Sequence, residues 1–215
     1  MKTLELHGTG DAWTFNRLPE ALAELEIQPL GVIHVGAHLG EEVPIYQQCM
    51  FGHIRLVEPD PDNCKKLRAD YGNIAAVIEA ACGQRPGRAV FRKSAASVFS
   101  SLNKPRKETG RFPVELVTLR QLQDKFPLTN VAVIDTQGTE LDVLRGADLD
   151  RLDLIIIETQ EGDQVIGNAP ASAANWYEVR GYMAAAGWIP AIQWRHERAG
   201  SKYASYADTL FVRAN

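Results

Sequence analysis

The fold is indicated first by the stretch VIHVGAHLGE at residues 32–41. An apolar run leads into two glycines, Gly36 and Gly40, and a helical pattern begins directly after them. This order is typical of a strand that enters a glycine-rich turn and leaves it at the N-terminus of a helix. Glycine lets the backbone approach a ligand closely, and the first N–H groups of a helix have no partner inside the helix. We therefore expect a nucleotide-like ligand at this turn.

The composition of the chain is that of one globular domain. Its 215 residues are 45% hydrophobic and 23% charged, which is enough for a full core. The net charge of −4, without a long basic run, predicts no nucleic acid partner. No apolar run approaches the roughly 20 residues that span a membrane, so we expect no membrane partner. Three cysteines without a CxxC pair predict reduced thiols and a cytoplasmic protein.

The first half of the chain alternates strands with helices. Residues 1–30 are predicted to form an N-terminal helical segment, with a helix at 18–25, ahead of a ligand-binding domain at 31–215. In that domain we expect strands at 31–35, 54–58 and 74–79, with helices at 41–50 and about 60–72 between them. Apolar strands in this β-α-β-α-β order predict an α/β fold with a doubly wound, mostly parallel sheet.

The second half continues this pattern and then departs from it. We expect strands at 114–117, 130–135 and 152–158, helices at 118–126, 139–145 and 173–186, and a polar loop at 161–170. The last two strands, at 188–194 and 207–212, are separated by a polar turn region at 195–206 without a helix. Two strands joined in this way pair antiparallel.

One basic stretch interrupts the alternation. Beyond a turn at 83–87 and a short strand at 89–91, residues 92–111 are predicted to form a loop, which is unusually long for a compact domain. Two interpretations are open, a solvated basic loop and a lid over an anionic or polar ligand. The stretch has six basic residues and one acid: Arg92, Lys93, Lys104, Arg106, Lys107, Arg111 and Glu108.

Acidic residues follow the predicted strands at the edge where ligands bind in open α/β sheets. They are Glu58, Asp135 and Glu158. Glu58 lies 22 residues after Gly36 (58 − 36), a spacing that suits an acid accepting both hydroxyls of a ribose. The alternative is an acid that caps a helix beside a tight turn. The turn is G-x-x-x-G rather than G-x-G-x-x-G, and acids surround it, which disfavours a pyrophosphate. An adenosine ligand without phosphates, S-adenosyl-L-methionine, fits better.

Four stretches of the sequence carry a resemblance to a known family: residues 33–40, 57–61, 134–147 and 156–158. With these motifs the chain resembles the FkbM family of methyltransferases, within the class I S-adenosyl-L-methionine-dependent fold. The resemblance implies a Rossmann-like, mostly parallel seven-stranded sheet whose last strand is antiparallel. Residues 31–215 would then be the methyltransferase domain. The implied reaction is methyl transfer to a hydroxyl oxygen of a small-molecule acceptor, such as a sugar or secondary metabolite.

The resemblance also implies a cofactor site. The glycine turn would pass against the methionine part, Glu58 would bind the ribose hydroxyls, and Ala81 and Cys82 would flank the adenine. The cofactor-binding residues implied are His34, Gly36, Ala37, His38, Gly40, Glu58, Pro59, Asp60, Ala81, Cys82, Ser101, Asp135 and Gln137.

Four positions depart from the family pattern. His34 stands where the family has an acid, and His38 where it has an asparagine. Val133 replaces a frequent lysine, and Gln137 a frequent glutamate. A neutral His34 can accept one hydrogen bond, whereas a protonated one would repel the ammonium group of the cofactor.

Methyl transfer from a sulfonium is an in-line displacement, so the enzyme mainly positions the acceptor and removes its proton. Asp135 is the first candidate base, Glu158 the second and Glu140 the third. The structural alternatives are that Asp135 orders the cofactor's amino group, Glu140 caps a helix and Glu158 holds a loop.

A metal site is not expected, because His34 and His38 are separated by a turn. Two other functions stay open, a NAD-dependent oxidoreductase of Rossmann type and a non-catalytic cofactor-binding homologue.

Overall fold

The computed structural model describes residues 14–97, 100–105, 107–161, 176–197 and 205–214. In chain order its helices and strands are η1 (Thr14–Arg17), α1 (Leu18–Glu24), β1 (Gly31–Val35), α2 (Val43–Gln48), β2 (His53–Glu58), α3 (Pro61–Tyr71), β3 (Ala75–Glu79), β4 (Ala81–Cys82), β5 (Gly87–Ser94), β6 (Glu108–Val117), α4 (Leu119–Lys125), β7 (Val131–Ile134), α5 (Glu140–Arg145), η3 (Leu149–Arg151), β8 (Leu154–Glu161), α6 (Trp176–Ala185), β9 (Trp188–Glu197) and β10 (Ser205–Arg213).

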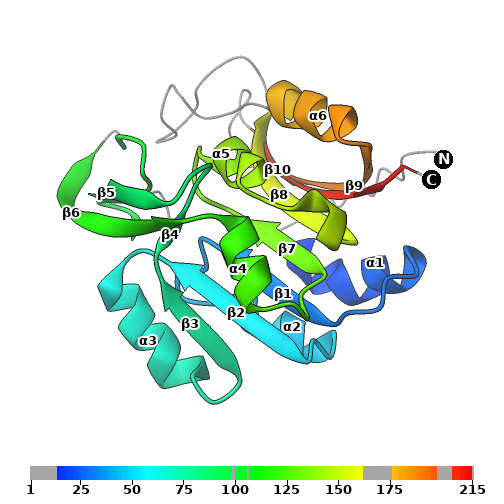
Figure 1. Cartoon of the computed structure of the whole chain (residues 1–215), viewed down its shortest axis with the longest axis horizontal. Coiled ribbons are helices and arrows are strands. Elements are labelled where there is room, and N and C mark those ends of the chain that lie inside the picture. The colour runs from blue at the N-terminus through cyan, green and yellow to red at the C-terminus, as the bar shows by residue number, and fades with distance from the viewer. Residues whose placement is uncertain (1–13, 98–99, 106, 162–175, 198–204, 215) are drawn as a thin grey trace.

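A seven-stranded sheet in the order β3-β2-β1-β7-β8-β10-β9 forms the centre of the described residues (Figure 1). The first five strands of this order pair in parallel, and β10 lies antiparallel between β8 and β9. Strands are added outward from β1 in both directions, so β1 and β7 flank the switch point of a doubly wound sheet. The predicted fold class is confirmed, including the antiparallel last strand.

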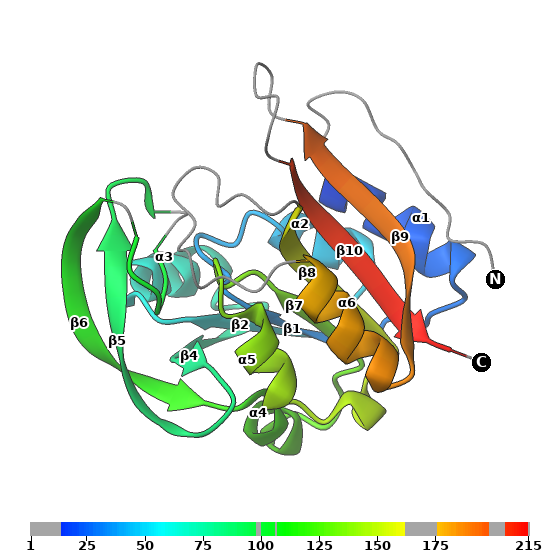
Figure 2. The same ribbon diagram turned by 90° about the horizontal axis from the view of Figure 1, so that it is seen from above.

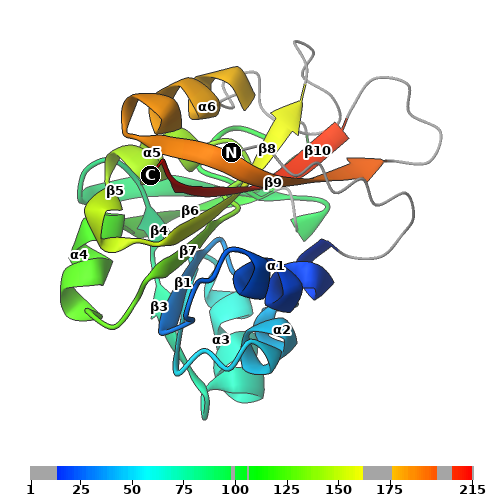
Figure 3. The same cartoon turned by 90° about the vertical axis from the view of Figure 1, so that its right-hand side faces the viewer.

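The central strand β1 is buried on both faces, and this determines where the helices lie. Val32 packs in a core cluster with residues of α1, α2 and α3, whereas Ile33 packs in a second cluster with residues of α4, α5 and α6. Figure 3 shows these two groups of helices on opposite sides of the sheet. A parallel sheet covered on both faces favours apolar side chains, which explains why β1 is apolar except at His34.

Residues 92–111 do not form the long loop that the sequence predicted. β5 and β6 form an antiparallel hairpin, and β6 also pairs with β4, giving a small second sheet in the order β4-β6-β5 (Figure 2). Contacts between the two strands stabilise the hairpin: the ring centroids of the opposite residues Phe91 and Phe112 lie 5.6 Å apart, and Arg92 forms an ion pair with Glu108 at 3.0 Å. A two-stranded ribbon with one face in solvent has polar residues at alternate positions. The basic residues on that face were therefore interpreted as a loop when only the sequence was considered. Only the connection 95–107 remains of the predicted loop.

Other differences lie at the ends of elements. β9 extends to Glu197 and β10 begins at Ser205, so part of the predicted polar turn is strand, because ladder hydrogen bonds use the backbone alone. The predicted helix 41–50 is shortened to α2. α6 begins at Trp176; the predicted start at residue 173 and the predicted loop 161–170 lie, apart from residue 161, outside the described residues.

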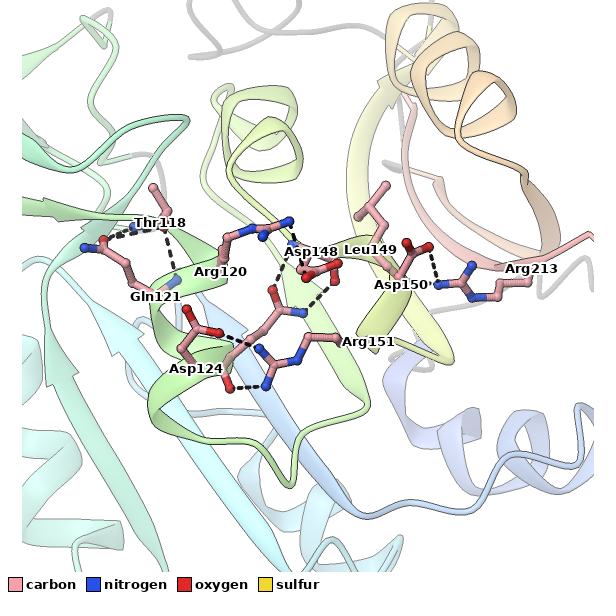
Figure 4. Close-up of polar contacts among 10 residues, drawn as sticks. Thr118, Arg120, Gln121, Asp124, Asp148, Leu149, Asp150, Arg151 and Arg213 are labelled. Atoms are coloured by element: carbon pink, nitrogen blue, oxygen red, sulfur yellow. Dashed lines mark hydrogen bonds and ion pairs between the residues drawn. The ribbon is translucent and has the colours of Figure 1, made fainter.

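A polar network fastens α4, η3 and β10 at the amino ends of β7 and β8. The amide of Gln123 donates to the carbonyl of Asp148 at 2.8 Å and accepts from its N–H at 2.9 Å. Figure 4 shows Arg151 reaching Asp124 and Arg213 reaching Asp150. This network holds the edge of the sheet opposite to the strand ends that carry the acids. Among the described helices, none has the length and apolarity needed to cross a membrane.

Candidate active site

The strand register brings the predicted site residues to one edge of the sheet. Val35 of β1 pairs with Val57 of β2 and with Ile134 of β7, and Ile134 pairs with Ile157 of β8. The residue after each of these positions therefore lies at the same edge. Those residues are Gly36, Glu58, Asp135 and Glu158.

The glycine turn is held by protein contacts on both sides. The N–H groups of Gly36 and Ala37 donate to the carbonyl of Val57 at 2.9 and 3.1 Å. Gly36 has a φ of 89°, and a Cβ there would lie 1.7 Å from the carbonyl oxygen of Asp135. Gly40 has a φ of 78°, and its Cβ would lie 2.9 Å from a side-chain carbon of Leu67 on α3. Both positions thus require glycine because the turn passes close to β7 and α3.

Glu58 ties this turn to the junction of β2 and α3. Its carboxylate accepts from the N–H of His38 and from the N–H of Asp60, each at 2.9 Å. Burial raises the pKa of Glu58 to about 7. Asp60 caps α3 by accepting from the N–H of Asp62 at 3.0 Å, and Pro59 is buried between these two acids. Glu58 therefore has the structural contacts of the capping alternative, and its ribose role stays a prediction.

Asp135 and Glu158 form a half-buried carboxyl pair. The amide nitrogen of Gln137 donates to Asp135 at 2.6 Å and to Glu158 at 2.7 Å. Burial raises the pKa of Asp135 to about 6, although the hydrogen bond from Gln137 opposes this shift. Burial and the charge of Asp135 hold the pKa of Glu158 well above its usual range. Two carboxyls in contact titrate as a pair, so Glu158 retains a proton while Asp135 ionises.

Glu140, the third candidate base, is engaged with the backbone. One of its oxygens accepts from the N–H of Thr136 at 3.1 Å, from the Thr136 hydroxyl at 3.2 Å and from the N–H of Gly138 at 2.8 Å. Burial raises its pKa to about 7. These contacts fix the turn after β7, whereas the alternative considered for Glu140 was a helix cap. Its role as a base stays a prediction.

Three described residues between β5 and β6 contact the turns of the candidate site. The Nε2 atom of His38 lies 3.0 Å from the hydroxyl of Ser97, and Ser101 donates to the carbonyl of Thr136 at 3.1 Å. Asn103 donates to the carbonyl of Gly138 at 3.0 Å. The connection thus contacts both the glycine turn and the turn after β7. A hydrogen bond to Glu41 raises the pKa of His38.

Ala81 and Cys82 form β4 directly after β3, as expected for residues beside an adenine. Ala81 packs against Phe91 and Val114, and Cys82 packs in the core cluster with α4 and α5. Burial raises the pKa of the Cys82 thiol to about 12, so it is inert packing at neutral pH. Their contact with adenine stays a prediction.

His34 points into the core beneath the glycine turn. Only 2% of it is exposed, and its Nδ1 atom lies 3.0 Å from the hydroxyl of Tyr46. Burial lowers the pKa of His34 to about 4, so the ring is neutral at physiological pH. The ring therefore does not carry the charge that would repel an ammonium group.

Two acids at this edge of the sheet were missed from the sequence. Glu42 lies 3.7 Å from His34, and Asp208 of β10 lies opposite Glu158 in the strand register. Glu42 and Tyr46 are four residues apart at the start of a helix, and Asp208 is a single acid in an apolar strand. Both are signals that sequence reasoning could have used. Within the described residues, no group of three or more His, Cys, Asp or Glu side chains has the arrangement of a metal site.

The sheet order and the glycine turn define a class I methyltransferase fold, and solved structures of this class are similar to the chain. An FkbM methyltransferase from Methylobacillus flagellatus KT matches with a TM-score of 0.54 and 12% identity, over 85% of this chain and 44% of its own. A putative tRNA (m1A22) methyltransferase from Streptococcus pneumoniae, in complex with S-adenosyl-L-methionine, matches with a TM-score of 0.53 and 11% identity. The match covers 92% of this chain and 72% of that protein. A Burkholderia thailandensis 1,6-didemethyltoxoflavin-N1-methyltransferase with bound S-adenosylhomocysteine matches with a TM-score of 0.51 and 15% identity. The match covers 94% of this chain and 79% of that protein.

The family is given by the sequence itself. Residues 34–188 match the methyltransferase FkbM domain, so the chain belongs to the FkbM methyltransferase family, as its motifs predicted. The predicted cofactor, S-adenosyl-L-methionine, agrees with this family and with the ligands of the two bound neighbours. The chain spans less than half of the M. flagellatus protein. A comparison with curated proteins gives no match.

Proposed function

We propose that this protein is an S-adenosyl-L-methionine-dependent O-methyltransferase whose acceptor is a hydroxyl group of a small polar molecule, such as a sugar or a secondary metabolite. The carboxyl pair of Asp135 and Glu158, bridged by Gln137, carries the proposal. Methylation of a neutral hydroxyl requires a group that takes its proton. A pair whose two carboxyls ionise at different pH provides one carboxylate near neutral pH.

The charge of the site supports a cationic cofactor. Burial raises the pKa values of Asp135, Glu140 and Glu158, and the charge of Asp135 raises those of Glu140 and Glu158 further. A ligand with positive charge stabilises such carboxylates, and S-adenosyl-L-methionine carries a sulfonium and an ammonium group. The pyrophosphate of NAD would instead add negative charge to the same edge. The residues present therefore fit S-adenosyl-L-methionine better than a dinucleotide.

In the proposed reaction, the bound cofactor supplies a methyl group on a positively charged sulfur. The glycine turn 36–40 holds the methionine part and Glu58 holds the ribose. Asp135 takes the proton of the acceptor hydroxyl, while Gln137 fixes the orientation of its carboxylate. Glu158 keeps its own proton, so the pair bears one negative charge rather than two.

Calorimetric titration with S-adenosyl-L-methionine and with NAD tests the cofactor. We expect binding of the first and none of the second; the reverse result would overturn the proposal. Turnover is then measured as S-adenosylhomocysteine formed with a panel of sugars, polyols and hydroxylated metabolites. Amines and RNA are tested as acceptors in parallel. Methylation only of an amine or of RNA would refute the hydroxyl acceptor. Cofactor binding without turnover on any acceptor would favour a non-catalytic homologue.

Two substitutions test the assignment of the base. Asp135→Asn removes the base, so kcat falls about 100- to 10,000-fold, while the cofactor Kd changes a few-fold. Glu158→Gln is the matched control, because a glutamine resembles the protonated carboxyl and most of kcat is retained. The kcat of the native protein rises with pH through a midpoint at or below about 6, since only ionised Asp135 accepts a proton. A larger loss in Glu158→Gln than in Asp135→Asn would exchange the two roles.

A further inference from the structure

One carboxyl oxygen of Glu42, Oε2, is buried without a hydrogen-bond partner among the described residues. Glu42 stands two residues after Gly40, at the N-cap position of α2. Its side chain is 14% exposed, and its Oε2 atom is fully buried and makes no hydrogen bond within the described residues. A buried polar atom without a partner is costly, so a side chain of this kind marks a place where a ligand completes the contacts.

The surroundings of Glu42 supply negative charge and neutral groups. The Nδ1 atom of His34 on β1 lies 3.7 Å from the Oε2 atom of Glu42, which is too far for a hydrogen bond. That Nδ1 atom is already in contact with the hydroxyl of Tyr46. The charges that act on Glu42 are those of Glu41, Asp135 on β7 and Asp208 on β10. Burial, with a smaller contribution from these charges, raises the pKa of Glu42 to about 8.

We propose that Glu42 binds the ammonium group of the cofactor's methionine part. An ammonium group has three N–H donors and a positive charge, so it gives the unpaired oxygen a donor and the carboxylate a counter-ion. The position fits this role, because Glu42 directly follows the turn that the proposed function assigns to the methionine part. The uncharged side chains of His34 and Tyr46 lie beside Glu42 in this site. The inference rests on the proposed function.

Two ligands separate the ammonium contact from the rest of the cofactor. S-Adenosylhomocysteine carries the amino-acid part, whereas 5′-methylthioadenosine keeps the adenosine and the thioether and lacks it. Calorimetry should show that Glu42→Gln weakens binding of S-adenosylhomocysteine about 10- to 100-fold, the range of a charged hydrogen bond. Binding of methylthioadenosine should change by less than about threefold. Glu41→Gln is the matched control, because it replaces the neighbouring glutamate in the same way. It should weaken binding of S-adenosylhomocysteine by less than about threefold.

Proton release gives a readout that needs no variant. Glu42 is largely protonated at about pH 7 in the free protein and must lose its proton when it pairs with an ammonium group. Titrations in phosphate and in Tris, whose ionisation enthalpies differ, count the protons released. We expect native protein to release more protons with S-adenosylhomocysteine than with methylthioadenosine, and Glu42→Gln to remove this difference.

The outcomes distinguish the two proposals. If native protein binds neither ligand, the proposed function fails, and this inference fails with it. If native protein binds S-adenosylhomocysteine while Glu42→Gln leaves its affinity unchanged, only the inference is overturned. Equal losses for both ligands would make Glu42 a structural residue. Should the variant fail to fold, equal proton release with the two ligands in native protein would be enough to reject the assignment.

Discussion

Single residues in the glycine turn are constrained by the protein as well as by its proposed ligand. The sequence suggested that Gly36 and Gly40 let a ligand approach. In the structure a side chain at either position would meet β7 or α3. The requirement for glycine at Gly36 therefore follows from the close approach of two strand ends, and it is present before any ligand binds.

Gly36→Ala tests this constraint, with Gly187→Ala as its control. Both glycines have positive φ, 89° and 80°, but a Cβ at Gly187 would meet no atom of the described residues within 4 Å. Gly187→Ala should lower the free energy of unfolding by about 1–2 kcal/mol, the cost of the left-handed backbone alone. Gly36→Ala adds a backbone clash and should lower it by at least about 3 kcal/mol. Urea unfolding measures both, and equal losses would contradict the contact with Asp135.

The elements that carry the site are ended and aligned by local polar contacts. α4 begins with a complete capping box between Thr118 and Gln121, visible in Figure 4. α5 begins at Thr139, whose side chain makes no capping hydrogen bond. The N–H groups of Thr136 and Gly138, in the turn between β7 and α5, donate to the side chain of Glu140.

The two caps predict different effects of the same substitution. Thr118→Val removes a hydroxyl that accepts from the N–H of Gln121 at 3.1 Å, so it should lower the free energy of unfolding by about 1 kcal/mol. Thr139→Val makes the same change of side chain at a position where no capping hydrogen bond is lost. We expect it to lower the free energy of unfolding by less than about 0.5 kcal/mol. Thermal or urea unfolding of the two variants compares them directly. A larger loss at Thr139 would show that its hydroxyl has a role beyond these contacts.

The whole molecule concentrates buried acids at one edge of its sheet. The pKa is raised to about 7 for Glu58 and Glu140 and to about 8 for Glu42, mainly by burial. A folded state whose carboxyls have raised pKa values binds more protons than the unfolded state. Its stability is then highest at low pH and falls as the pH rises through the folded pKa values.

This sign predicts the pH dependence of unfolding. Between about pH 6.5 and 8.5 the melting temperature of the free protein should fall, by about 2–4 °C for each kcal/mol lost. His38, whose pKa is raised, acts in the same direction. His34, whose pKa is lowered, acts only below this window. Calorimetric scans across the window test the prediction, and Glu42→Gln should flatten its upper end. A melting temperature that rises with pH would contradict it.

Much of the fold and part of the site could be predicted because they depend on local patterns. Continuous apolar runs indicated β1, β7 and β8, since strands covered on both faces exclude polar residues. The acids directly after those runs, such as Asp135, could be placed at one edge because parallel strands end together. Glu42 could not be found in this way, since its burial depends on how α2 docks against β1.

The order of strands and helices, the cofactor class and the acids at the strand ends followed from residue type and spacing along the chain. Three features depended on contacts between distant segments. These are the hairpin of β5 and β6, the bridge from Gln137 to both carboxyls, and the unpaired oxygen of Glu42 beside His34. The physical reason is that burial and pairing are properties of neighbours in space. From sequence alone a polar residue is expected to be exposed to solvent. Only the folded structure shows that another segment covers it.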